Sequence, residues 1–144
     1  MRPGPERRDA YVRFERVQTR WADNDAYRHV NNLVYYSYFD TVINQILIEA
    51  GVLDIEASPV IGLAVETGCR YFSSVAYADV VWAGLRVGHL GTSSVRYEVA
   101  VFRGAAAEAS AQGHMVHVYV DRATQRPVAL PGALRALLEP LRRG

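Results

Sequence analysis

The chain has 144 residues, half of them hydrophobic, and its formal net charge at pH 7 is +1. This length is typical of a single domain, and the balanced charge argues against a nucleic-acid-binding protein. No apolar run reaches the roughly 18 residues that a transmembrane helix needs. The one cysteine, Cys69, excludes an intramolecular disulfide framework. We therefore expect a single-domain cytoplasmic protein with no nucleic-acid or membrane partner.

The chain begins with a polar lead and one strand. Residues 1–10 contain proline, glycine and charged side chains that bury little, which predicts a disordered lead before one domain over residues 11–144. Apolar and polar side chains then alternate across residues 11–19. This alternation predicts a half-exposed strand, and the polar cluster that follows it is expected to form a loop.

Residues 33–50 carry the clearest helical pattern. Apolar side chains recur at spacings of three and four: Tyr35, Tyr38, Phe39, Val42, Ile43, Ile46, Leu47 and Ala50. Gly51 stands where a left-handed residue would end the helix, and Asn31 or Asn32 can cap its start. The sequence predicts one long helix here.

Four β-rich stretches follow, over residues 60–72, 79–91, 93–104 and 106–121, and we expect them to form an antiparallel meander. In the third stretch, Val95, Tyr97, Val99 and Val101 alternate with more polar residues, so one face should be buried and the other polar or nearly so. His114 and His117 should face opposite sides of the fourth. A short helix is expected within residues 131–143. The fold class is α+β, with a curved sheet of about five strands wrapped around one long helix.

The cluster "DNDAYRHVNN" lies just before the predicted helix. The first N–H groups of a helix have no partner within it and carry a partial positive charge, so this end favours an oxyanion. Asp25, seven residues before Asn32, can act as nucleophile or general base on a carbonyl polarised there. Asp23 or Asp25 can equally well cap an ordinary turn, because Asp is a common turn former.

The stretch "DAYRHVNNLVYYSYFDTVINQIL" resembles the signature of hotdog-fold acyl-CoA thioesterases of the 4-hydroxybenzoyl-CoA thioesterase type. The resemblance implies a hotdog fold, with Asp25 as the catalytic carboxylate and the backbone N–H of Asn32 polarising the thioester carbonyl. The same resemblance implies that Asp23 has a structural role. His29 matches the motif histidine and either orients Asp25 or the loop, or simply bonds to the backbone. Many relatives have glycine where this chain has Arg28.

Further substrate contacts follow from the same resemblance. Ser93, Ser94, Arg86 and Arg96 are candidate coenzyme A contacts, although a solvated hairpin explains them equally well. Glu66 can reach the site of a neighbouring subunit or face solvent. Tyr35, Tyr36 and Tyr38 can line an acyl pocket or pack in the core or at a dimer contact. The resemblance also implies a homodimer or homotetramer with active sites at subunit interfaces.

Two other functions remain open from the sequence. One is hydration or dehydration of an acyl thioester, which would use His29 and an acidic residue. The other is non-catalytic binding of acyl-CoA. No zinc-ligand spacing is present among the histidines, so no cofactor is implied beyond the coenzyme A of the substrate. Short, long and aromatic acyl groups all stay open, and the lack of an obvious basic patch favours coenzyme A over an acyl carrier protein as the thiol carrier.

Overall fold

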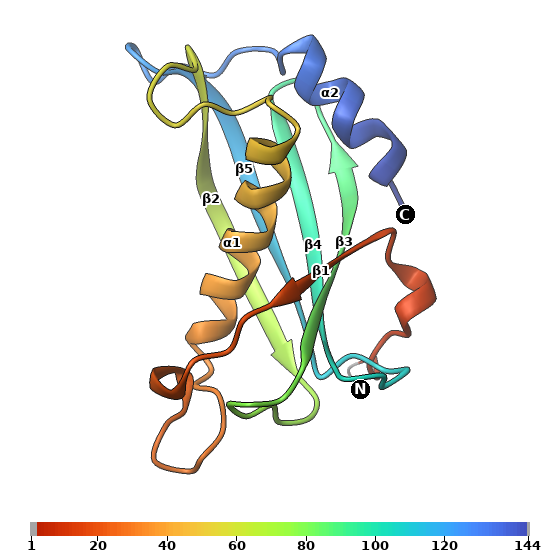
Figure 1. The fold of residues 1–144 in the computed structure, drawn as a ribbon. Helices are drawn as coiled ribbons and strands as arrows, with labels where there is room; N and C mark the ends of the chain where they lie inside the picture. The colour runs from red at the N-terminus through yellow and green to blue at the C-terminus, as the bar shows by residue number, and fades with distance from the viewer. Residues whose placement is uncertain (1–2, 144) are drawn as a thin grey trace.

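The computed structural model describes residues 3–143. Its main elements are β1 (Arg13–Val17), α1 (Val34–Glu49), β2 (Val60–Tyr71), β3 (Val81–Leu90), β4 (Ser94–Arg103), β5 (Ala111–Asp121) and α2 (Gly132–Leu138). Short 3₁₀ turns cover Arg8–Ala10, Trp21–Asp23 and Glu139–Leu141. The strands form one antiparallel sheet, and α1 packs across one face of it (Figure 1). The predicted α+β arrangement is confirmed.

Helix α1 matches its sequence pattern closely. Seven of the eight side chains predicted for its apolar face are buried: Tyr35, Tyr38, Phe39, Val42, Ile43, Ile46 and Leu47. Ala50 is exposed, because it lies one residue beyond the end of the helix. Gly51 has a φ of 73°, which is the left-handed conformation expected of the residue that ends a helix. The helix is therefore the central element of the core, and its ends lie within one residue of the prediction.

The order of strands in the sheet is β1-β3-β4-β5-β2, so the predicted four-strand meander is wrong in one place. β3, β4 and β5 are antiparallel neighbours, whereas β2 pairs with β5 at the far edge. The nine residues between β2 and β3 can span about 30 Å when extended, and crossing the three strand spacings takes only about 14 Å. A link of this length does not force a hairpin. Within residues 3–143, no strand pairs with the second edge of β2.

The inner face of the sheet is as predicted. Val95, Tyr97, Val99 and Val101 are at most 1% exposed and pack toward α1. His117 is also buried, whereas His114 lies on the other face, where its Nε2 is 2.8 Å from Oε2 of Glu66. The expectation that the two histidines face opposite sides is confirmed.

The N-terminal segment covers part of the outer face, which corrects the prediction of a disordered lead. Arg8–Ala10 form a 3₁₀ turn, and the Glu6 carboxylate pairs with Arg86 at 2.8 Å. Tyr11 packs on Phe102 with ring centroids 6.0 Å apart, so this end of the outer face is apolar rather than polar. Residues 1 and 2 lie outside the described part of the chain. Local composition did not predict this segment because its hydrogen-bond partners include residues 80 to 106 positions away in the chain.

The C-terminal helix is confirmed but is shorter than predicted. α2 ends at Leu138, and a 3₁₀ turn containing Pro140 follows, because proline lacks the N–H that would continue the helix. Leu134 and Leu138 are buried in the main core. No helix in residues 3–143 is both long enough and apolar enough to cross a membrane.

Candidate active site

The loop before α1 is a tight hairpin. Asn24 and Val30 form an antiparallel bridge, the N–H of Arg28 donates to the carbonyl of Asp25 at 3.0 Å, and the N–H of Asp25 donates to the carbonyl of His29 at 2.9 Å. This pattern is that of a β-turn followed by a bulge residue in the left-handed region. Arg28 occupies the bulge position, with a φ of 65°. The loop therefore has a defined shape.

Asp25 lies half-buried within this hairpin. Its Oδ1 accepts a hydrogen bond of 2.8 Å from the N–H of Tyr27, as in an ordinary Asx turn. Within residues 3–143, Oδ2 of Asp25 accepts no hydrogen bond, so one oxygen is available to a ligand. Asp25 can therefore form the turn through Oδ1 and act on a substrate through Oδ2, so the two roles considered in the sequence analysis are compatible.

Asp23 is a structural residue, in agreement with the sequence analysis. Its side chain is 1% exposed and accepts hydrogen bonds from the Tyr38 hydroxyl and the Arg20 N–H, both at 2.8 Å. Burial alone would raise the pKa of Asp23, but these hydrogen bonds and the Arg20 charge hold that pKa below its usual value. The carbonyl of Asp23 accepts the N–H of Asn31 at 2.9 Å and so ties the loop to the start of α1.

The two asparagines at the helix start have different roles. Oδ1 of Asn31 accepts the N–H of Leu33 at 2.9 Å, which forms an Asx turn just before α1. The residue at the N-cap position is Leu33 and no side chain caps α1, so the prediction that Asn31 or Asn32 caps the helix is wrong. The carbonyl of Asn32 accepts the Tyr71 hydroxyl at 2.8 Å. In the described part of the chain, the N–H of Asn32 has no acceptor, which leaves it available at the positive end of α1.

A surface hollow of about 660 Å³ lies beside this loop. Its lining residues are Trp21, Asn24, Asp25, Arg28, Ala76 and Tyr77. The link between β2 and β3 forms one side: the N–H of Tyr77 donates to Asn24 Oδ1 at 2.9 Å, and Val75 accepts the N–H of Val30 at 2.7 Å. Sequence reasoning missed Trp21, Ala76 and Tyr77, since nothing local indicates that these two segments meet.

His29 is exposed, and no hydrogen bond in residues 3–143 involves its ring. Its carbonyl closes the hairpin by accepting the Asp25 N–H. The structure therefore places His29 in the same loop as Asp25 without a hydrogen bond between the two side chains. Tyr35, by contrast, is buried, with its ring 5.3 Å from that of Tyr71, and burial raises the pKa of Tyr35.

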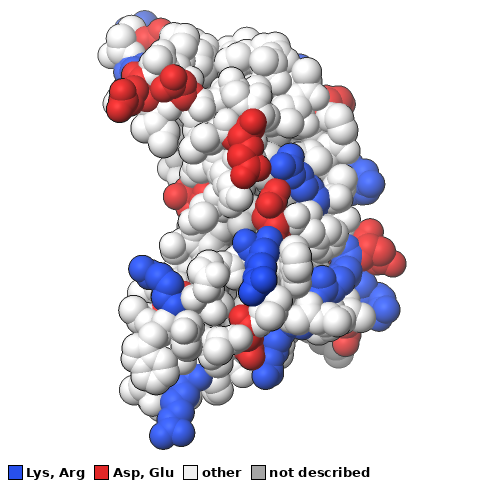
Figure 2. All heavy atoms as spheres, in the orientation of Figure 1, with Lys and Arg blue, Asp and Glu red and all other residues white. Residues whose placement is uncertain are grey.

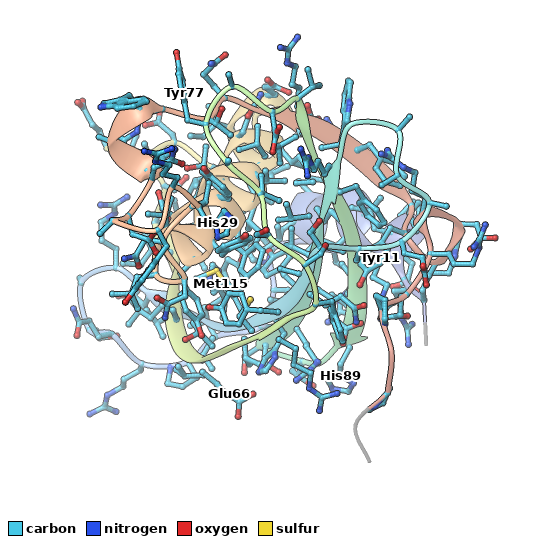
Figure 3. All side chains as sticks on the ribbon, turned by 90° about the horizontal axis from the view of Figure 1, so that it is seen from below. Tyr11, His29, Glu66, Tyr77, His89 and Met115 are labelled. Atoms are coloured by element: carbon cyan, nitrogen blue, oxygen red, sulfur yellow. The ribbon has the colours of Figure 1, made fainter. Side chains whose placement is uncertain are left out.

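Arg86, Arg96 and Glu66, which the sequence analysis proposed as substrate contacts, lie together on the outer face of the sheet, away from Asp25. Arg86 is held by Glu6 and by Glu98, at 2.8 and 2.7 Å, and Arg96 pairs with Glu98 at 2.8 Å. Glu66 lies 3.7 Å from Arg96 and hydrogen-bonds to His114 at 2.8 Å, so it joins this network. Viewed from below, Glu66 projects on the side of the molecule opposite to Tyr77 and away from His29 (Figure 3). Within one subunit the structure does not bring this group to the hollow.

Ser93 and Ser94 lie at the turn between β3 and β4. Their carbonyls accept the N–H groups of Tyr119 and Gly91, at 2.7 and 2.8 Å. This turn is at the end of the sheet opposite to the Asp25 loop (Figure 1). One subunit therefore does not combine these serines with Asp25.

The arrangement of α1 against a five-stranded antiparallel sheet is the hotdog fold. Slr0204, a 1,4-dihydroxy-2-naphthoyl-CoA thioesterase from Synechocystis, shares it with a TM-score of 0.80 at 14% identity, over 89% of this chain and 96% of that one. At this identity the likeness concerns the fold alone. The chain belongs to the thioesterase-like superfamily, whose family model matches residues 19–138.

Two solved structures are more similar in sequence. The PA5185 protein from Pseudomonas aeruginosa strain PAO1 is 48% identical, with a TM-score of 0.94, and the match covers 97% of this chain and 98% of that one. A thioesterase from Thermus thermophilus, crystallised with coenzyme A and zinc, is 28% identical, with a TM-score of 0.69 over 89% of this chain and 92% of that one. No curated protein matches the chain.

Proposed function

We propose that this protein hydrolyses an acyl-CoA thioester to a free acid and coenzyme A. The observation that carries the proposal is that the loop before α1 holds two groups with no hydrogen-bond partner in residues 3–143: the Asn32 N–H, which has no acceptor, and Oδ2 of Asp25, which has no donor. Hydrolysis of a thioester uses both kinds of group: a hydrogen-bond donor that stabilises the oxyanion, and a carboxylate that activates water or attacks the carbonyl carbon. Membership of the thioesterase-like superfamily supports this assignment.

The chemistry follows from these roles. With Asp25 as general base, water attacks the carbonyl carbon while the carboxylate takes a proton from the water. The Asn32 N–H stabilises the negative oxygen of the tetrahedral intermediate, together with the positive end of α1. The C–S bond then breaks, and the departing thiolate takes the proton that Asp25 had accepted from the water. With Asp25 as nucleophile, the carboxylate attacks the carbonyl carbon, the C–S bond breaks, and coenzyme A leaves as a thiolate. Water then opens the resulting anhydride and supplies the proton that the thiolate takes, so the same two groups serve both routes.

Coenzyme A is the proposed thiol carrier because the Thermus relative was crystallised with it. The two alternative functions receive less support. A hydratase or dehydratase would need His29 next to an acidic partner, and the His29 ring bonds to none within residues 3–143. A protein that only binds acyl-CoA would not need the free carboxylate oxygen of Asp25.

We also propose that the active form is a homodimer or homotetramer assembled through β2. Within residues 3–143, β2 is the edge strand of the sheet, with no further strand beside it, and edge strands of this kind readily pair with another copy. Leu63 and Val65 are 37% and 61% exposed in the same strand. Light scattering should give the mass of a dimer or a multiple of it. The variant Val65→Lys should shift the mass toward the monomer; a native monomer would contradict this part of the proposal.

The function is tested by following free-thiol release from acetyl-, hexanoyl-, palmitoyl- and benzoyl-CoA. Burial raises the pKa of Cys69 to about 11, so this cysteine should react slowly with the thiol reagent and add little background. Steady release from at least one substrate is the expected result. Binding of these compounds without release would favour an acyl-CoA-binding protein, and hydration of crotonyl-CoA without release would favour a hydratase.

A further inference from the structure

Arg28 has a backbone conformation that favours glycine. Its φ of 65° lies in the left-handed region, where a side chain is strained, and it occupies the bulge position of the Asp25 hairpin. Strained residues of this kind often belong to functional sites, but the strain itself does not say what they do. The role of Arg28 therefore has to be inferred from the groups around its side chain.

The side chain of Arg28 is exposed and lines the hollow beside Asp25. In residues 3–143, no carboxylate pairs with its guanidinium. Arg20, Arg86 and Arg96, by contrast, are each held by an acidic side chain. In Figure 2, basic side chains project at the lower left, the end of the molecule where this loop lies in Figure 1. Arg28 thus offers an unpaired cation with several N–H donors at the hollow.

The remaining walls of the hollow are largely apolar. Trp21 and Tyr77 are 77% and 43% exposed, and their rings meet edge to face with centroids 6.0 Å apart. Exposed aromatic rings around a hollow are typical of a binding surface. The hollow therefore combines apolar walls, one cation and the Asp25 carboxylate.

We propose that this hollow binds acyl groups that end in an anion, such as ω-carboxyacyl groups, and that Arg28 selects them. The inference rests on the proposed function, because it takes Asp25 and the Asn32 N–H as the position of the thioester carbonyl. Trp21 and Tyr77 contact the carbon chain, and the guanidinium binds the terminal carboxylate through charge-assisted hydrogen bonds.

Distance favours an anion on the acyl group over a phosphate of coenzyme A. Asp25 and Arg28 are the first and last residues of one β-turn, so their Cα atoms lie within about 7 Å of each other. The pantetheine arm separates the thioester from the nearest phosphate by about a dozen bonds, roughly 15 Å when extended. An ω-carboxylate lies only a few bonds beyond the carbonyl, which matches the position of Arg28.

The test is a binding measurement with two coenzyme A thioethers that cannot be hydrolysed: 2-oxoheptyl-CoA and 6-carboxy-2-oxohexyl-CoA, in which a carboxylate replaces the terminal methyl. Calorimetric titration compares the native protein with Arg28→Gly and Arg28→Lys. Gln125→Gly is the matched control, since Gln125 also has a positive φ, of 58°, but does not line the hollow.

The native protein and Gln125→Gly should bind the carboxylate analogue about three- to tenfold more tightly than the methyl analogue. Arg28→Gly should lose this preference, Arg28→Lys should keep part of it, and salt should weaken it. Glycine suits the backbone at position 28, so the variant should fold. Equal affinities for the two analogues in the native protein, or equal losses for both in Arg28→Gly, would overturn the proposal. Since no hydrolysis is measured, a failure of the proposed thioesterase activity would appear in a different assay.

Discussion

The hydroxyl of Tyr38 donates a hydrogen bond of 2.8 Å to Oδ2 of Asp23, and both side chains are at most 5% exposed. Tyr38 belongs to α1, whereas Asp23 belongs to the loop that carries Asp25. The contact therefore holds the loop that carries the candidate carboxylate against α1, and the candidate amide of Asn32 lies just before the start of this helix.

Removal of this hydroxyl should destabilise the fold. Tyr38→Phe leaves a buried carboxylate with one donor fewer, and we expect the free energy of unfolding to fall by about 1–3 kcal/mol. Urea unfolding at pH 7 measures the change. Tyr27→Phe is the matched control. Tyr27 is 82% exposed, so this variant should keep nearly all of the free energy of unfolding. Equal effects of the two variants would contradict the structural role of Tyr38.

The pKa of Asp23 should make the fold sensitive to acid. Since this pKa is lower in the folded than in the unfolded chain, the ionised carboxylate stabilises the fold above the unfolded pKa of about 4, and the contribution is lost as the pH falls further, through the folded pKa. Asp23→Asn should be less stable at pH 7 and should lose less stability between pH 5 and pH 3. Some acid sensitivity should remain, because the pKa of Glu98 is shifted in the same direction: burial would raise it, but Arg96 and Arg86 lower it. Parallel pH curves for the native protein and the variant would rule this account out.

Gly113 should tolerate no side chain. A Cβ atom there would lie 2.7 Å from Cζ of Phe39 and 2.8 Å from the backbone oxygen of Gly68, and closer still to Cε2 of the same phenylalanine. Gly113→Ala should therefore cost about 1–3 kcal/mol through overpacking between β5 and α1. Gly132→Ala is the control, because nothing lies within 4 Å of a Cβ at that position. Thermal unfolding of both variants gives the comparison, and similar melting temperatures would speak against the close packing of Phe39.

Asn31 and Asn32 should respond differently to alanine. Asn31→Ala removes the hydrogen bond between its side chain and the Leu33 N–H in the Asx turn before α1, and should cost about 1 kcal/mol of stability. Asn32→Ala removes an exposed side chain but keeps the backbone N–H, so both stability and thioester hydrolysis should be nearly unchanged. Denaturation curves and thiol-release rates measure the two effects. A large loss of hydrolysis in a stable Asn32→Ala variant would mean that its side chain, and not its amide, acts on the substrate.

The sequence predicted the features that depend on local pattern. The three- and four-residue spacing of α1 identified its buried face, and alternation in β4 identified the core side of that strand. The motif placed Asp25 and Asn32 at the start of the helix because the loop and the helix are adjacent in the chain. The resemblance led us to expect glycine at position 28, and the positive φ of Arg28 is a backbone conformation that glycine adopts easily.

Features that depend on distant contacts were not predictable in this way. The pairing of β2 with β5 places segments about 50 residues apart next to each other. The ion pair of Glu6 with Arg86 orders the N-terminal segment, although the composition of that segment indicates disorder. Tyr77 reaches the hollow through the link between β2 and β3, where the residues look like an ordinary turn. No local periodicity encodes these contacts.

The most direct test of the account is the rate of coenzyme A release by Asp25→Asn, measured as kcat/KM on the best acyl-CoA substrate. Asp40→Asn is the matched control, since Asp40 is an exposed aspartate on α1 that does not line the hollow. We predict that Asp25→Asn lowers kcat/KM by about a hundredfold or more at unchanged melting temperature, whereas Asp40→Asn stays close to the native rate. A native rate in a folded Asp25→Asn variant would contradict the assignment of Asp25 as the group that activates water or attacks the thioester.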